Sequence, residues 1–206
     1  MTEVSPKERL AGKPLKREVF AEMLAMNFEK LPDIDKSLYL YGSFYLAGNS
    51  AFVGLIANSL YRRSLNVSQA GISAMLPMAV MPFMTTYALY NATVSTPLLS
   101  GSVNCPTCVL LRGALVGALS GAVYPIALAL PLNFGLAVRY RTAPMPEKGN
   151  LPRYWLDVSR PVWRRMRAAV LLQTLFGTYL GSRDFETYGK LVQLTVGSRT
   201  EELELD

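Results

Sequence analysis

Three long stretches of this sequence carry no charged side chain, and they constrain the fold more than any other feature. The stretches lie between Lys36 and Arg62, between Arg63 and Arg112, and between Arg112 and Arg139. A helix needs about 20 apolar residues to cross the roughly 30 Å hydrocarbon core of a bilayer. Only 17% of the residues are charged, whereas a soluble domain usually carries about 25%. The sequence therefore predicts an all-α, polytopic membrane protein.

The uncharged stretches predict a bundle of about four transmembrane helices, at residues 39–60, 72–90, 113–136 and 162–182. The fourth segment differs from the others, because only Ala168 to Ser182 is free of charge and that length is short for a bilayer. It spans if Val162, Trp163 and Met166 extend it while the neighbouring arginines reach the membrane surface. The alternative is three spans and a re-entrant or surface helix.

Two polar segments flank the predicted membrane domain, which covers residues 37–182. Residues 1–36 mix basic and acidic side chains, and REVFAEMLAMNFEKL within them predicts a short amphipathic helix. This helix could lie on a membrane, on a partner or on the spans of its own chain. Residues 183–206 are expected to form a polar, acidic tail, which frays over Glu201 to Asp206.

Basic side chains gather in two of the predicted connections and predict the orientation of the chain. The connection at residues 91–111 has no charge, so the positive-inside rule places it, with both termini, on the opposite side from the basic connections. The basic residues taken for this prediction are Arg62, Arg63, Arg139, Arg141, Arg164, Arg165 and Arg167.

A stripe of glycine runs along the third predicted span in the sequence GALVGALSG. Gly113, Gly117 and Gly121 recur every fourth residue, so they share one narrow face of a helix. Small residues let another backbone approach closely, which favours helix association in membranes. Packing within the chain's own bundle is the simpler reading. Docking of a partner's helix is the functional interpretation, and we favour it because no other feature of the sequence indicates a function.

The sequence NCPTC places Cys105 and Cys108 at the spacing found in thiol–disulfide enzymes. Those enzymes present the pair at a strand-to-helix turn, and no strand pattern precedes it here. A structural disulfide or two idle thiols is the expected state, with redox catalysis, or a metal completed by a partner's ligands, as the alternatives.

Other catalytic chemistry finds little support. The chain has no histidine, so it lacks the commonest metal ligand and general base. No nucleophile–base set, paired carboxylates or phosphate-binding glycine loop is evident, and the net charge of +6 comes mainly from the third connection rather than from a nucleic-acid patch. We expect no enzymatic activity and no cofactor. A small transporter or channel remains an alternative, because Pro77, Pro82, Pro125 and Pro131 could break helices around an ion.

Several long segments, in order and with similar spacing, resemble the transmembrane protein 126 family, most closely its A member. They run from about Tyr41 to Ser182, whereas the N-terminal 36 residues and the acidic tail resemble the family much less. The segments are GLIANSLYRRSLNV (54–67), LPMAVMPFMTT (76–86), CPTC (105–108), YPIALALPLNFGLAVRY (124–140), PEKGN (146–150) and LLQTLFGTYLGS (171–182).

The resemblance implies a mitochondrial inner-membrane protein that helps to assemble the membrane arm of respiratory complex I. It implies complex I membrane-arm subunits and other assembly factors as partners, and it implies no catalytic residues. In that membrane the basic connections would face the matrix, and Cys105 and Cys108 the intermembrane space. The residues alone leave open whether copies of the chain associate.

Overall fold

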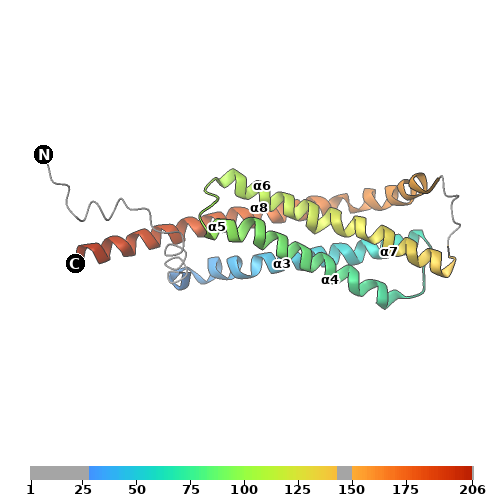
Figure 1. Cartoon of the computed structure of the whole chain (residues 1–206), viewed down its shortest axis with the longest axis horizontal. Coiled ribbons are helices and arrows are strands. Elements are labelled where there is room, and N and C mark those ends of the chain that lie inside the picture. The colour runs from blue at the N-terminus through green and yellow to red at the C-terminus, as the bar shows by residue number, and fades with distance from the viewer. Residues whose placement is uncertain (1–27, 143–149, 206) are drawn as a thin grey trace.

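A computed structural model describes residues 28–142 and 150–205 of the chain. Four helical rods run antiparallel, so the chain passes up and down the bundle four times (Figure 1). In the part of the chain that the structure describes there is no strand, which confirms the all-α prediction. The predicted amphipathic helix lies almost wholly outside the described residues, and only a short turn at its end, η1 (Phe28–Lys30), is described.

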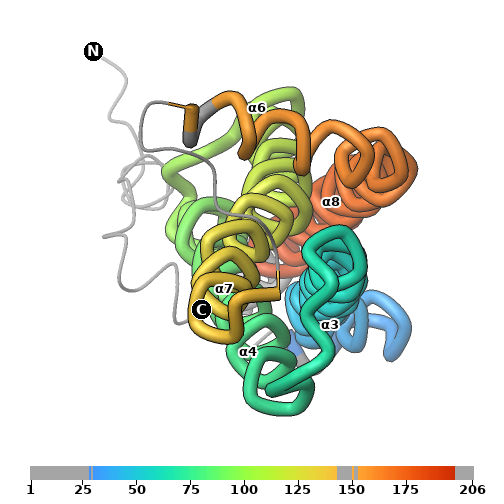
Figure 2. The backbone as a smooth tube through the Cα atoms, turned by 90° about the vertical axis from the view of Figure 1, so that its right-hand side faces the viewer, coloured from blue at the N-terminus to red at the C-terminus, as the bar shows by residue number. Residues whose placement is uncertain are grey.

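The first rod is α3 (Asp33–Ser64). The second rod joins α4 (Gly71–Tyr90), η2 (Asn91–Ser95) and α5 (Thr96–Leu99). The third joins α6 (Pro106–Leu115), η3 (Val116–Val123) and α7 (Tyr124–Tyr140), and the fourth is the single helix α8 (Leu151–Leu205). A view along the bundle shows α3, α4, α7 and α8 around a common centre (Figure 2), and α3 contacts each of the other three.

The segments η2 and η3 are π-helical, and each lies just before a proline. Pro97 and Pro125 cannot donate to the carbonyls four residues earlier, and their rings would clash with those carbonyls in a regular α-helix. A wider turn relieves that clash, and such turns are the usual form of π-helix. The carbonyl of Thr93, to which Pro97 cannot donate, accepts a hydrogen bond of 3.1 Å from Arg112 Nη1. Arg112 therefore ties α6 to the second rod.

Three of the rods are long and apolar enough to cross a membrane: Asp33–Ser64, Gly71–Leu99 and Pro106–Tyr140. The second extends beyond the predicted 72–90, because the helix widens before Pro97 instead of ending there. The third extends beyond the predicted 113–136 at both ends and includes Arg112. The predicted span 162–182 lies inside α8, which is not among the three. Its uncharged part, residues 168 to 182, is 15 residues long and reaches only about 22 Å at 1.5 Å per residue.

The fraying predicted from Glu201 onward differs from the structure, since α8 continues as helix to Leu205. Its buried residues continue at spacings of three and four beyond the predicted end of the fourth span, which is the period of one helical face. That face lies against the rest of the bundle and stabilises the extra turns. The buried residues of this part are Asp184, Thr187, Tyr188, Leu191 and Thr195.

Polar side chains inside the bundle bind one another in pairs between helices. Thr86 Oγ1 on α4 lies 3.0 Å from Ser50 Oγ on α3, and both residues are fully buried. Asn133 Nδ2 on α7 donates to Asn58 Oδ1 on α3 over 2.8 Å. In an apolar environment a polar group without a partner is costly, so these pairs fix the register of α4 and α7 relative to α3.

Candidate helix-docking site

The glycine stripe of the third rod faces α8. A methyl group on Gly113 would lie 2.4 Å from the carbonyl oxygen of Gly177, and one on Gly117 would lie 2.3 Å from that of Gln173. The approach is mutual, because a methyl group on Gly177 would lie 2.3 Å from the Gly113 carbonyl oxygen. Real Cβ atoms do not come so close, so the two backbones meet where no side chain fits.

The groove is therefore filled from within the chain, which corrects the expectation that a partner's helix docks there. At Gly121 the Gln173 side chain occupies the space, 2.6 Å from where a Cβ would lie, and its Nε2 donates to the Leu46 carbonyl over 3.0 Å. Gln173 thus connects α8 with both α3 and the third rod. The sequence contained a signal for this pairing, since Gly177 and Gly181 are also four residues apart, inside the short fourth segment.

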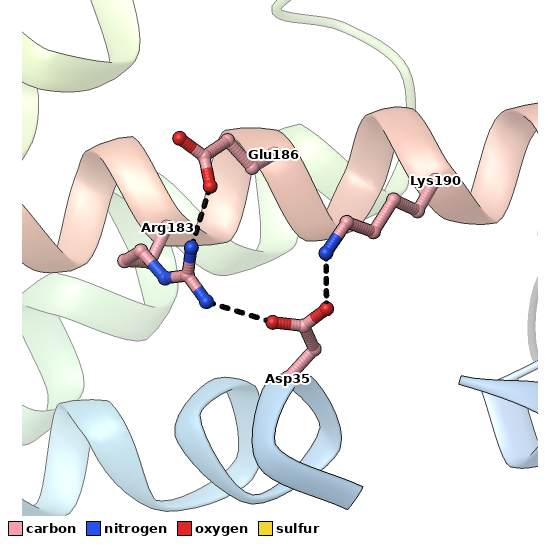
Figure 3. Close-up of polar contacts among 4 residues, drawn as sticks. All are labelled: Asp35, Arg183, Glu186 and Lys190. Atoms are coloured by element: carbon pink, nitrogen blue, oxygen red, sulfur yellow. Dashed lines mark hydrogen bonds and ion pairs between the residues drawn. The ribbon is translucent and has the colours of Figure 1, made fainter. Parts of the chain in front are cut away.

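An ionic cluster joins α3 and α8 at the end of the bundle where α3 begins (Figure 3). The Asp35 carboxylate is only 4% exposed, and Arg183 Nη2 donates to its Oδ1 over 2.8 Å. Lys190 Nζ donates to the other oxygen, Oδ2. Arg183 Nη1 also binds Glu186 Oε2 over 2.7 Å. Both oxygens of the buried carboxylate are thus paired with cations.

A second buried carboxyl group lies next to this cluster along α8. Asp184 is buried, and its Oδ2 accepts a hydrogen bond of 2.9 Å from the hydroxyl of Tyr90 at the end of α4. Together with the Asp35 contacts, this bond holds the C-terminal part of α8 to two of the other rods. The predicted tail is thus part of the packed structure.

The outer face of α3 carries an asparagine that the bundle leaves unpaired. Asn49 is exposed, has no hydrogen-bond partner among the described residues, and lies at the middle of the uncharged stretch from Ser37 to Tyr61. Gly48 beside it has no atom within 4 Å of the position of a Cβ. Tyr45 and Phe52 lie on the same face and are 61% and 65% exposed.

Gly48 thus leaves open space on the surface of α3, next to an exposed amide group near the middle of the uncharged stretch. In hydrocarbon an amide without a partner is costly, and asparagine side chains there bind across helix interfaces. An open glycine also allows a second helix to approach closely. We define the outer face of α3 by Tyr45, Gly48, Asn49, Phe52 and Ile56, which follow one another at helical spacing. The sequence held this pattern inside the first predicted span.

The cysteines lie at the turn that begins α6. Both are exposed free thiols, so the disulfide that was one expectation is not formed here. Cys105 is the N-terminal cap of α6, and its Sγ accepts a hydrogen bond of 3.4 Å from the backbone N–H of Cys108. Hydrogen bonds from the side chain and backbone of Cys108 lower the pKa of the Cys105 thiol. The described residues contain no group of three potential metal-ligating side chains.

Four of the basic residues of the predicted orientation lie where α3 and α7 end, at the opposite end of the bundle from Cys105: Arg62, Arg63, Arg139 and Arg141 (Figure 1). The structure places Arg164, Arg165 and Arg167 inside α8 and not in the connection before it. Arg62 has a structural role at the end of α3, since its guanidinium donates to the carbonyls of Ser68, Gln69 and Ala70 over 2.9–3.2 Å. Arg63, Arg139, Arg141, Arg164, Arg165 and Arg167 are exposed. None of these seven arginines forms an ion pair with another described side chain.

These features define an α-helical membrane protein whose long C-terminal helix is packed into the bundle through small residues and an ionic cluster. The family described as Transmembrane protein 126 matches residues 18–198, and the chain belongs to that family. The match includes the ionic cluster and most of α8.

The chain is similar both to proteins named Transmembrane protein 126A and to proteins named TMEM126B. The chain is 49% identical to mouse (Mus musculus) "Transmembrane protein 126A" over 179 residues, which cover 87% of this chain and 91% of the relative. It is 46% identical to the human (Homo sapiens) protein of that name, over 84% of this chain and 88% of the relative. It is 33% identical to rat (Rattus norvegicus) "Complex I assembly factor TMEM126B, mitochondrial", over 80% and 71% of the two chains. No solved structure matches the chain.

Proposed function

We propose that this protein is a non-enzymatic assembly factor for respiratory complex I in the mitochondrial inner membrane. The observation that carries the proposal is the 33% identity to a relative named as a mitochondrial complex I assembly factor. The three long apolar helices support membrane residence. The described residues contain no candidate metal cluster. We therefore assign the function to a surface of the helices.

The outer face of α3 is the surface that we assign to this work. The glycine stripe of the third rod is occupied by α8, whereas Gly48 is open and the Asn49 amide has no partner. We infer that a transmembrane helix of a newly inserted membrane-arm subunit packs over Gly48 and offers a polar group to Asn49. A hydrogen bond of this kind in a membrane contributes about 0.6–2 kcal/mol. Such a contact favours association and still allows release, as an assembly factor requires.

We further propose that the basic end of the bundle faces the matrix. Membrane proteins retain arginine-rich connections on the side from which they insert. Both basic connections lie at one end of the antiparallel bundle, which supports a common side for them. Cys105 and Cys108 would then face the intermembrane space, as would the described end of α8 if that helix spans fully.

Native gel separation of mitochondria in mild detergent, with mass spectrometry on each gel slice, tests the assembly role. We expect the protein to co-migrate with partial membrane-arm species of complex I, and mature complex I to fall when the gene is removed. Migration at its own small mass, with mature complex I unchanged by its removal, would overturn the proposal.

One observation favours a second candidate function, a thiol oxidoreductase of the intermembrane space. Cys105 caps a helix, is exposed, and has a lowered pKa, which are features of reactive cysteines. The surroundings of the pair are otherwise unlike those of known thiol–disulfide enzymes, because a loop and not a strand precedes it. A variant that lacks both thiols separates the two candidate functions, assembly factor and thiol oxidoreductase.

A further inference from the structure

A cavity opens between α7 and α8 at the basic end of the bundle. Its volume is about 650 Å³, and it is lined by Leu130 from α7 and by Trp155, Leu156, Ser159, Arg160 and Trp163 from α8. Leu130 belongs to the candidate span Pro106–Tyr140, ten residues before its end, so the cavity opens beside that span. Leu156 is 69% exposed, which leaves the cavity accessible from outside the bundle.

The two tryptophans that line the cavity are the only two in the chain. Tryptophan gathers where the apolar core of a bilayer meets the headgroups, because its ring is apolar and its N–H is polar. The Trp155 ring is held edge-on against Phe134 of α7, with 5.6 Å between ring centroids. The Nε1 atom of Trp155 is buried and has no hydrogen-bond partner among the described residues.

The charge around the cavity selects the kind of ligand. Arg160 lines it, is exposed, and has no ion-pair partner among the described side chains. Arg153 and Arg164 lie seven residues before and four residues after Arg160, and therefore on the same face of α8. An unpaired guanidinium binds phosphate oxygens through two N–H groups at once. The cavity therefore combines an apolar wall with a site for an anion.

We propose that this cavity binds an anionic phospholipid. An acyl chain lies against Leu130, Leu156 and Trp163, and the phosphate accepts hydrogen bonds from Arg160. Basic pockets between membrane helices bind anionic headgroups in this way. Free phosphate offers nothing to the apolar wall, and a zwitterionic lipid brings a cation close to the arginines. The site is separate from the outer face of α3 and does not depend on the proposed function.

Tryptophan fluorescence of the full-length protein in vesicles reads this site directly, because both tryptophans line it. Two sets of vesicles contain equal amounts of phosphatidylglycerol and phosphatidylcholine, and bromine, which quenches tryptophan, is on the acyl chains of one lipid or of the other. We expect stronger quenching when phosphatidylglycerol carries the bromine. Equal quenching in the two sets would overturn the proposal, as would loss of the difference when inorganic phosphate is added at constant ionic strength.

The variant Arg160→Gln tests the anion contact, and Arg165→Gln is its matched control. Arg165 is exposed on the same helix and does not line the cavity. We expect Arg160→Gln to reduce the preference for phosphatidylglycerol about fivefold, the effect of one basic residue near an anionic surface. Arg165→Gln should retain the preference. Equal loss in both variants would show a general attraction of the basic end and would overturn the assignment of this cavity.

Discussion

Asp35 on α3 and Arg183 on α8 are 148 residues apart in sequence, and in the folded chain their side chains form an ion pair of 2.8 Å. The carboxylate is buried whereas the guanidinium is partly exposed. Lys190 binds the second oxygen of the same carboxylate. The contact joins the first described rod to the last one, and it shows that residues after 182 belong to the packed structure.

Removing the Asp35 charge should loosen α8 from α3. Asp35→Asn leaves the side chain in place but takes from Arg183 and Lys190 their charged acceptor. Hydrogen bonds to charged groups contribute about 1.5–3 kcal/mol, and we expect a total loss near the lower value because both cations are partly exposed. Thermal unfolding in detergent should show a melting temperature lower by about 3–6 °C.

The control for that variant is Asp33→Asn. Asp33 precedes Asp35 by two residues, is exposed, and has no ion pair among the described side chains. Its substitution should change the melting temperature little. Equal effects of the two substitutions would contradict the structural role of the Asp35 cluster.

The glycine contact between the third rod and α8 predicts a larger effect. Gly117→Leu places a side chain where a Cβ already lies 2.3 Å from the Gln173 carbonyl oxygen. Overpacking a well-packed interior costs about 1–3 kcal/mol, and we expect at least the upper value because the obstacle is backbone. The amount of protein in the membrane and its melting temperature should both fall.

Gly135→Leu is the matched control, because Gly135 on α7 has no atom within 4 Å of the position of a Cβ. We expect this variant to accumulate normally. A Gly117→Leu protein that accumulates and melts as the wild type does would mean that α8 does not pack on the glycine stripe in the membrane.

The Cys105 thiol predicts a pH dependence. Because its pKa is lowered, the thiolate should persist to lower pH than for an ordinary cysteine, whose pKa is about 8.5. Alkylation by iodoacetamide, which attacks thiolates, should therefore reach half its maximal rate below that pH. Mass spectrometry of the labelled peptide gives the rate at Cys105 separately from that at Cys108.

The variant Cys108→Ala removes the side-chain donor that contributes most to the lowered pKa and should move the midpoint to higher pH. Cys108→Ser keeps a donor and should move it less. A wild-type midpoint equal to that of free cysteine would refute the effect of the cap.

The assembly account predicts that the thiols are dispensable for function. A variant with both Cys105→Ser and Cys108→Ser should restore mature complex I in cells that lack the protein, because the proposed surface lies on α3. Native gels with staining for complex I activity measure this. A failure to restore complex I, together with a mixed disulfide trapped by Cys108→Ser alone, would favour the thiol oxidoreductase.

Sequence reasoning predicted the rods better than their contacts. The uncharged stretches located three spans, because a bilayer excludes charge regardless of what the helices pack against. The second span extends past its predicted end because the helix widens before Pro97 and does not stop there, an effect that depends on neighbours such as Arg112. The sequence around Gly117 does not show which helix packs against it, because helix pairing depends on the surfaces of both helices. For the same reason the sequence alone predicts a polar tail after residue 182. Asp184 and Arg183 are polar in sequence, but in the fold they face Tyr90 and Asp35.

Complementation of cells that lack the protein tests most directly whether a partner's helix binds the outer face of α3. The measurement is the amount of mature complex I on native gels after expression of wild type, Gly48→Leu or the control Gly135→Leu, with membrane levels of each protein matched. Both glycines are open, so leucine at either position should leave the fold intact. The account predicts that wild type and Gly135→Leu restore complex I, whereas Gly48→Leu leaves partial membrane-arm species. Full restoration by Gly48→Leu would contradict it.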